Sequence, residues 1–514
     1  MKKAISLILS LILIFSVAVP CFASNEEYPT IYVTGAQTNN LFSADGQRIY
    51  PIGADAGAII KEAIGPCIDK LLKGFITNDY ADYAQEFYNA MAPVFEKVKL
   101  DKNGEASDGS HPEYHSSTVA VSDKKSGYGM WDFRFWYDWR LAPTVTATEL
   151  RDYIDKVKAA TGKDKVQLVG RCYGANVIQA YITLYDDHAV ENVSDIAYYS
   201  SSALGIEFMS ALFSGEVVLE EQAVTQFANF YLENENLIED PATELLVLSL
   251  IELFNKAKVL GIGTDMLLKI FDTVKSDLIP MVVRDTVGSW PSYWAMVTPE
   301  LYEKSRDFIF AGCEDEYEKF IEKTDKYYYE VAVCTEDKIL ELKDKGINFY
   351  VFSKYGFPAY PLYEGATGQS DADTSLYRQS FRAESAPYGE ILPDSYINAM
   401  PDKKYLSPDH KVDASTCLLP ETSWFFKNLH HNEFAVLHDM TLEIMREDMT
   451  VESGKYPQFY NHENGVLSPQ EGLDEDAVKT PDGPLASLMR FVAALINFIK
   501  GLLRGEINLD LFKK

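Results

Sequence analysis

The pentapeptide Gly170-Arg171-Cys172-Tyr173-Gly174 is the feature that most constrains the fold. It follows an apolar strand predicted over 165–169 and precedes a helix predicted over 175–185. A residue on a sharp strand-to-helix turn between glycines is typical of the nucleophile position in α/β enzymes, because the glycines leave room around it. The first N–H groups of the helix would stabilise a thiolate and an oxyanion there. The alternative is a structural cysteine buried in a tight turn.

The segments around this turn alternate between helix and strand. Ala147 to Ala160 has apolar residues at helical spacing, and Thr146 with Glu149 has the spacing of a capping box at its start. Another strand is predicted over 195–200. This order predicts an α/β fold, with a mostly parallel sheet and helices on both faces.

The sequence predicts that the α/β core is divided into two parts, 24–204 and 346–450. A helical pattern over 205–345 lies between them, before the sheet resumes at 347–352, and it is interpreted as a helical cap or lid insertion. The alternative is a set of extra packing helices. Residues 451–514 form a C-terminal tail.

Residues 1–23 have the pattern of a cleavable signal peptide. Lys2 and Lys3 precede an apolar run from Ile5 to Val19, and cleavage is predicted after Ala23. The alternatives are a lipoprotein anchored at Cys21 and an uncleaved anchor. The pattern predicts a secreted, extracytoplasmic protein.

The composition excludes several classes of partner. The formal charge is -30, and it becomes two units more negative when Lys2 and Lys3 leave with the signal peptide. Such a field repels nucleic acid and polyanionic substrates. The hydrophobic content of 47% is sufficient for a sizeable core.

The cysteines leave two alternatives open. Cys21 leaves with the signal peptide, and Cys172 is the candidate nucleophile. The remaining cysteines are Cys67, Cys313, Cys334 and Cys417. They permit two disulfides in an exported chain, or four buried free thiols. No spacing resembles a zinc site, and we expect no metal, nucleotide or organic cofactor.

An acid and a histidine should follow the nucleophile in the chain. Asp371 or Asp373 follows the strand predicted over 347–352, although a solvated acidic loop is the alternative. His430 or His431 follows a strand predicted over Thr422 to Phe426, and His431 is favoured as the general base.

Two backbone N–H groups are expected to form an oxyanion hole. One belongs to Tyr173, directly after the nucleophile. The other is assigned to Ala36 or Gln37, because these residues follow the first predicted strand, 29–33.

Several of these segments together resemble the lecithin:cholesterol acyltransferase-like branch of the α/β-hydrolases. They are Asp138-Trp139-Arg140, Thr161-Gly162, and the strand and turn from Val166 to Gly174, with Thr34-Gly35 matching the family's first turn. Val412 to Cys417, followed by Trp424-Phe425, is similar to exported bacterial hydrolases of the same group. The resemblance implies an α/β-hydrolase fold and acyl transfer from a hydrophobic ester or lipid to water or an alcohol.

The sequence departs from this family at two positions. Cysteine stands at 172 in place of serine, which predicts either a working thiol enzyme or a catalytically silent relative that binds a lipid or cell-envelope ligand. Arg171 replaces the usual histidine and is expected to make the mouth of the site more cationic. Asp138 and Arg140 either shape the site or form a structural salt bridge.

Residues 484–504 form a candidate amphipathic helix in the tail. Apolar residues recur there at helical spacing, and Arg490, Lys500 and Arg504 gather on the opposite side. The pattern predicts peripheral membrane contact. The alternative is a terminal helix packed on the core or on a second subunit.

Overall fold

The computed structural model describes four long stretches of the chain, 27–51, 79–117, 133–218 and 278–472. Single positions or pairs between 70 and 77, between 220 and 230, and at 275–276 are also described. The predicted signal peptide and the predicted amphipathic segment 484–504 lie outside these residues. No helix in the described part of the chain is both long and apolar enough to span a bilayer.

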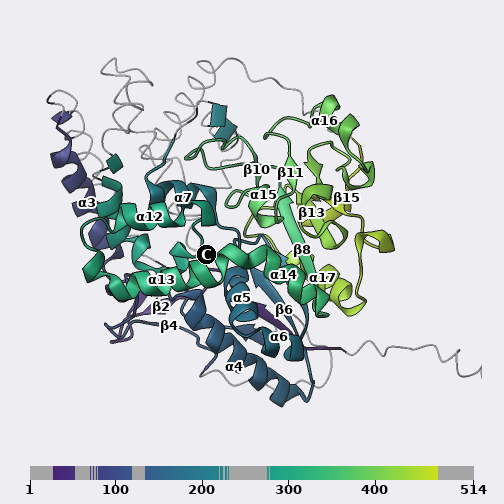
Figure 1. The fold of residues 1–514 in the computed structure, drawn as a ribbon, viewed down its shortest axis with the longest axis horizontal. Helices are drawn as coiled ribbons and strands as arrows, with labels where there is room; N and C mark the ends of the chain where they lie inside the picture. The colour runs from purple at the N-terminus through teal and green to yellow at the C-terminus, as the bar shows by residue number, and fades with distance from the viewer. Residues whose placement is uncertain are drawn as a thin grey trace, which may run out of the picture.

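An eight-stranded sheet organises the molecule (Figure 1). Its strand order is β15-β14-β13-β8-β7-β6-β1-β5, and every neighbouring pair is parallel except β14 with β15. The strands are β1 (Thr30–Val33), β5 (Phe133–Phe135), β6 (Val166–Arg171), β7 (Val193–Tyr199), β8 (Asn348–Tyr355), β13 (Ser423–Lys427), β14 (Phe459–Glu463) and β15 (Val466–Pro469). The predicted α/β class with a mostly parallel sheet is therefore confirmed.

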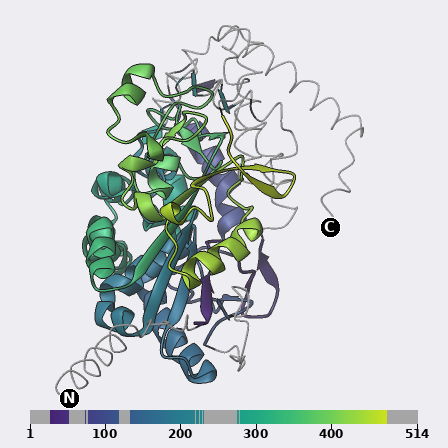
Figure 2. The same ribbon diagram turned by 90° about the vertical axis from the view of Figure 1, so that its right-hand side faces the viewer.

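Both faces of the central strands are buried, because successive side chains point to opposite sides. In β7, Ile196 and Tyr198 join one apolar cluster with α4 (Pro143–Thr161), α5 (Tyr173–Leu184) and α13 (Glu318–Glu330). Ala197 and Tyr199 join a second cluster with α17 (His438–Arg446). The sheet thus lies between α13 on one side and α17 on the other (Figure 2).

The described part of the predicted cap is helical. It contains α7 (Glu207–Ser214), α11 (Pro291–Trp294), α12 (Tyr302–Ile309), α13 and α14 (Thr335–Asp344). Trp290 and Trp294 are buried in the same apolar cluster as the sheet. Helices α13 and α14 pack on α5, and α14 also contacts β8. The division of the chain at 205 and 345 stays a prediction.

The remaining α-helices and short strands lie outside the eight-stranded sheet. They are α3 (Ala81–Phe95), α6 (Asp186–Asn192), α15 (Leu376–Gln379), α16 (Asp394–Ala399), and the short strands β2 (Leu41–Phe42), β3 (Arg48–Tyr50), β4 (His111–Pro112), β9 (Phe357–Pro358), β10 (Gln369–Ser370), β11 (Glu384–Ser385) and β12 (Val412–Asp413). Among them, the β9–β10 pair and α15 flank the segment that carries Asp371 and Asp373.

The prediction that Thr146 and Glu149 form a capping box at the start of α4 is wrong. The helix begins at Pro143, with Ala142 as a cap that has no side-chain hydrogen bond. Thr146 lies inside the first turn, where its hydroxyl donates to the carbonyl of Ala142 at 3.4 Å. Proline is well suited to the first helical position because its fixed φ is helical and its missing N–H has no partner there anyway.

The structure also contradicts one of the two alternatives for the cysteines, that of two disulfides. Cys313, Cys334 and Cys417 are free thiols. Cys67 lies outside the described residues. The prediction of two disulfides among these four is therefore wrong, because two bridges would need all four cysteines.

Candidate active site

Cys172 stands at the sharp turn between β6 and α5. Its backbone has φ 50° and ψ -124°, in the region that side chains disfavour. Gly174 makes the turn possible, because a Cβ there would lie 2.3 Å from the carbonyl oxygen of Val33. A Cβ on Gly170 would meet the Ile178 side chain at 2.7 Å. The glycines let β1, β6 and α5 approach closely around Cys172.

The backbone of Cys172 is held on both sides. Its N–H donates to the carbonyl of Tyr199 at 3.0 Å, and its carbonyl accepts from the N–H of Ala175 at 2.9 Å. Tyr173 begins α5, so its N–H has no acceptor within the helix. The role of this N–H as one oxyanion donor stays a prediction.

The turn after β1 lies beside the cysteine. An ideal Cβ on Gly35 would be 3.3 Å from the Cβ of Cys172. Ala36 packs against the main apolar cluster, as Cys172 does. Gln37 has φ 61°, and its side-chain amide donates to the hydroxyl of Tyr293. The structure brings both predicted oxyanion candidates to this edge of the sheet, and their role stays a prediction.

Asp371 and His431 form a buried pair at the same edge. Nδ1 of His431 lies 2.8 Å from Oδ2 of Asp371, and the two side chains are 3% and 0% exposed. The backbone N–H of His431 also donates to the carbonyl of Asp371 at 2.9 Å. Burial disfavours the Asp371 carboxylate, but the charge of His431, its hydrogen bond and Lys354 together lower the Asp371 pKa.

The neighbouring candidates occupy different places. Oδ2 of Asp373 lies 3.7 Å from Nε2 of His431, and its side chain is 42% exposed. His430 instead packs edge-on against Phe357, with ring centroids 5.4 Å apart. Burial and the charges of His431 and Lys354 lower the His430 pKa. Asp371 and His431 thus have the geometry of an oriented imidazole, and His430 does not.

Cys172 lies within electrostatic reach of His431. Burial opposes the imidazolium, but Asp371, Asp373 and Cys172 together raise the His431 pKa to about 10. Within the described residues no hydrogen bond joins Sγ to His431. Contacts between catalytic groups often become short only when substrate is bound.

A buried lysine missed by the sequence analysis holds the histidine loop. Nζ of Lys354, in β8, donates to the carbonyls of His430 at 3.2 Å, His431 at 2.9 Å and Glu433 at 2.9 Å. Burial is the main cause that lowers the Lys354 pKa to about 7. A lysine near the end of a mostly apolar strand was the signal that could have identified it.

Gln379 connects the lysine to the segment that carries the acid. Its side-chain amide donates to the carbonyls of Lys354 at 2.9 Å and Thr374 at 3.0 Å, and its oxygen accepts from the N–H of Lys354 at 2.8 Å. Lys354 and Gln379 together form a clamp that links the loops of His431 and Asp371.

Arg171 does not face the mouth of the site as expected. Its side chain is buried, its guanidinium lies 4.6 Å from the ring centre of Phe434, and it donates to the side chain of Asn432. As the last residue of β6, it points to the side of the sheet opposite α5. The expectation of a more cationic mouth is therefore wrong.

Asp138 and Arg140 form a buried fork. Nε and Nη2 of Arg140 donate to the two carboxylate oxygens of Asp138 at 3.0 and 2.7 Å. Arg140 also donates to Ser110 at 3.0 Å and to the carbonyl of Val98 at 3.2 Å. These contacts tie the 98–110 segment to the core, so the alternative of a structural salt bridge is the one that the structure supports.

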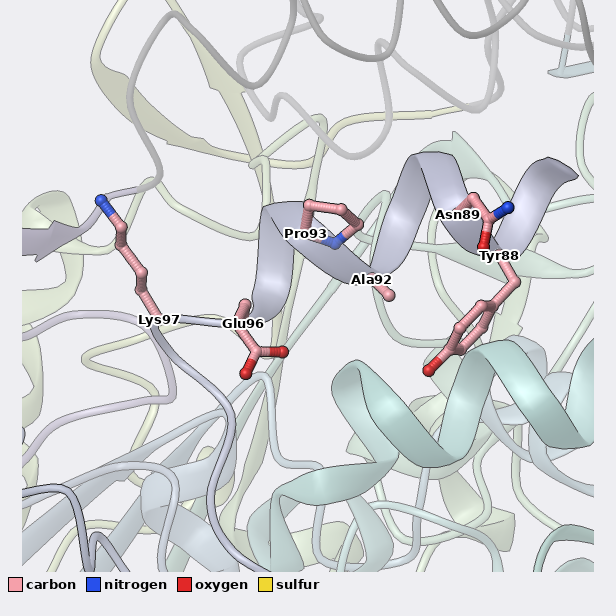
Figure 3. Close-up of a pocket in the computed structure, with 6 residues that line it drawn as sticks. All are labelled: Tyr88, Asn89, Ala92, Pro93, Glu96 and Lys97. Atoms are coloured by element: carbon pink, nitrogen blue, oxygen red, sulfur yellow. The ribbon is translucent and has the colours of Figure 1, made fainter. Parts of the chain in front are cut away.

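A surface hollow of about 470 Å³ shares no residue with this site. It is lined by residues of α3 and the two positions after it, including Tyr88, Pro93 and Lys97 (Figure 3). Its walls bring together no nucleophile, acid and base. In the described part of the chain, no group of three or more His, Cys, Asp or Glu side chains is arranged to hold a metal ion.

Comparison with known proteins adds no assignment to this geometry. No protein-family model matches the chain, and no curated protein matches it at a significant level.

Proposed function

We propose that this chain is an acyl hydrolase or O-acyltransferase of the α/β-hydrolase fold, with Cys172 as nucleophile, His431 as general acid and base, and Asp371 as the orienting acid. The single observation that carries the proposal is the strained turn at Cys172 beside a buried Asp371–His431 pair at one sheet edge. Strained backbone and pre-oriented acid–base pairs concentrate at functional sites.

The chain order supports the α/β-hydrolase fold. Nucleophile, acid and histidine follow one another along that fold, and the nucleophile sits on a strand–turn–helix unit. Here the three groups follow β6, β10 and β13 in the same order. The first-strand turn at Gly35 lies next to Cys172, where this fold supplies its second oxyanion donor.

Acylation follows from these positions. The Cys172 thiolate attacks the acyl carbon of the ester, and the carbonyl electron pair moves onto oxygen, facing the N–H of Tyr173 and of Ala36 or Gln37. When the tetrahedral intermediate collapses, the C–O bond to the alcohol breaks. Nε2 of His431 gives its proton to the leaving alkoxide, and a thioester remains on Cys172.

Deacylation reverses these roles. Water or an acceptor alcohol attacks the thioester while neutral His431 takes its proton, and the C–S bond breaks. The thiolate and the imidazolium are restored together. Asp371 accepts the Nδ1–H throughout and keeps Nε2 directed at the reacting atoms.

The substrate class rests on the surroundings and on the sequence resemblance. Cys172 and Ala36 both pack against the main apolar cluster, and the rings of Tyr137 and Tyr173 lie 6.3 Å apart behind the turn. An apolar environment favours a hydrophobic ester. The strongly negative charge disfavours a polyanionic one.

Ester hydrolysis by the full chain tests the proposal. With p-nitrophenyl butyrate, Cys172→Ala should abolish turnover and the burst of p-nitrophenol, while Cys334→Ala, which removes another partly buried thiol, should leave both unchanged. His431→Gln should lower turnover at least about a hundredfold, since general acid–base help contributes about 10² to 10⁴. Turnover that survives in Cys172→Ala would refute the nucleophile.

A silent relative that binds a lipid or cell-envelope ligand is the second candidate. The missing hydrogen bond between Sγ and His431 in the described residues favours it. An inert parent beside an active Cys172→Ser variant would show a decayed serine enzyme.

A further inference from the structure

Carboxylates face both ring nitrogens of His431. Asp371 lies 2.8 Å from Nδ1, and Asp373 lies 3.7 Å from Nε2. In a serine enzyme, Nε2 must be free of its proton in the resting state, because it takes the proton of the hydroxyl. A carboxylate beside that nitrogen stabilises the protonated form instead. This arrangement opposes serine chemistry.

The charges around the ring come from several elements. The groups near His431 or its loop are Asp371, Asp373, Cys172, His430, Lys354, Glu433 and Arg171. Arg171 and Lys354 are cations, but Arg171 is directed to Asn432 and Lys354 to backbone carbonyls. The carboxylates therefore act on the ring itself. Burial opposes protonation, yet Asp371, Asp373 and Cys172 raise the His431 pKa to about 10.

We propose that Asp373 is a positioning residue that keeps the proton on Nε2 of His431, so that the site operates with a resting thiolate–imidazolium pair and works poorly with serine at position 172. This inference rests on the proposed nucleophile. It also gives different roles to two carboxylates only two positions apart. Asp371 orients the imidazole ring of His431, and Asp373 keeps that ring protonated.

The difference between a thiol and a hydroxyl nucleophile explains why this site favours cysteine over serine at position 172. A thiol ionises far more readily than a hydroxyl and needs less general-base help, so a protonated histidine beside it is a usable resting state. The imidazolium then supplies the proton that the leaving alkoxide requires. A serine hydroxyl cannot lose its proton to a histidine that already carries one.

Four full-length proteins test this role: the parent, Cys172→Ser, Asp373→Asn and the double variant. The first measurement is the titration of the His431 ring by NMR, with the resonance assigned by His431→Gln. The second is hydrolysis of p-nitrophenyl butyrate between pH 6 and pH 10. The matched control is Asp439→Asn, which removes an exposed carboxylate that lies 2.8 Å from Nδ1 of His438.

The expected result is a shift of the His431 titration to lower pH by about one unit in Asp373→Asn, and no shift in the control. A shift of one unit leaves about tenfold more neutral imidazole at pH 8. The double variant should therefore hydrolyse the ester up to about tenfold faster than Cys172→Ser alone, since Cys172→Ser itself already removes one group that raises the His431 pKa. A merely structural aspartate would move neither readout in this direction.

Two results would overturn the inference. One is an unchanged His431 titration in Asp373→Asn, and the other is Cys172→Ser hydrolysing the ester as fast as the double variant. If none of the four proteins hydrolyses the ester, the proposed function fails, but the titration still decides the role of Asp373.

Discussion

Cys172 shows how much a single residue depends on its neighbours for its conformation. Its positive φ costs about 1–3 kcal/mol, which the rest of the fold must offset. Its N–H donates to the carbonyl of Tyr199. Gly174 has no side chain, so the carbonyl of Val33 can lie close to the Gly174 backbone. The strain is therefore fixed by contacts from β1 and β7, beyond the pentapeptide itself.

Gly174→Ala should destabilise the protein by about 2 kcal/mol or more, because the new methyl group meets backbone at 2.3 Å and that backbone cannot move as a side chain could. Urea denaturation followed by tryptophan fluorescence measures this change. Gly368→Ala is the matched control, since a Cβ at Gly368 meets nothing within 4 Å. Equal stability of the two variants would contradict this account.

At the scale of elements, the site depends on connections between loops and the sheet. Lys354 in β8 holds the His431 loop, and Gln379 in α15 joins Lys354 to the Asp371 segment. Elsewhere in the fold, Arg140 ties the 98–110 segment to Asp138. In each case one long polar side chain satisfies carbonyls that a loop would otherwise bury without partners.

Arg140→Met should lower the free energy of unfolding by about 3–5 kcal/mol, because it leaves the Asp138 carboxylate buried without its cation. Arg151→Met removes a guanidinium from an exposed pair with Asp152, so solvent screening should limit its effect to about 0.5 kcal/mol. Chemical denaturation of both variants checks the comparison. A small loss at Arg140 would mean that the fork contributes little to the fold.

At the scale of the whole molecule, two buried groups give opposite dependences of stability on pH. The His431 pKa is raised from 6.5 to about 10, so its contribution is full below pH 6.5 and is lost as the pH rises toward 10. The Lys354 pKa is lowered from 10.5 to about 7, so the unfolded chain binds the extra proton and stability rises over pH 7 to 10.5. Between pH 7 and 10 the two effects offset each other.

Lys354→Met should leave the pH dependence of stability that comes from His431 without an opposing effect. Relative to the parent, its free energy of unfolding should fall between pH 7 and pH 9, by up to about 1.4 kcal/mol per pH unit. Urea denaturation at several pH values measures the difference. Lys304→Met, at an exposed ion pair with Glu216, should follow the parent profile. Parallel profiles for Lys354→Met and the parent would refute the claim that His431 and Lys354 have opposite effects on the pH dependence of stability.

The sequence by itself determined the framework of this protein. Apolar runs and the glycines around Cys172 predicted the strand, turn and helix, because local spacing and backbone freedom are written in neighbouring residues. The same reasoning predicted an acid candidate after the strand at 347–352 and a histidine candidate after the strand at 422–426, and both strands are present as β8 and β13. It also favoured His431, which the structure pairs with Asp371.

The tertiary structure alone decided where each candidate lies and what it contacts. Asp371 and Asp373 are equivalent in sequence, but one is buried on Nδ1 and the other is partly exposed beside Nε2. Arg171 was expected at the mouth and lies instead against Phe434, and the clamp formed by Lys354 and Gln379 joins segments far apart in the chain. Burial, direction and charge arise when distant strands meet at one sheet edge, so they are properties of the packing and cannot be inferred from local sequence.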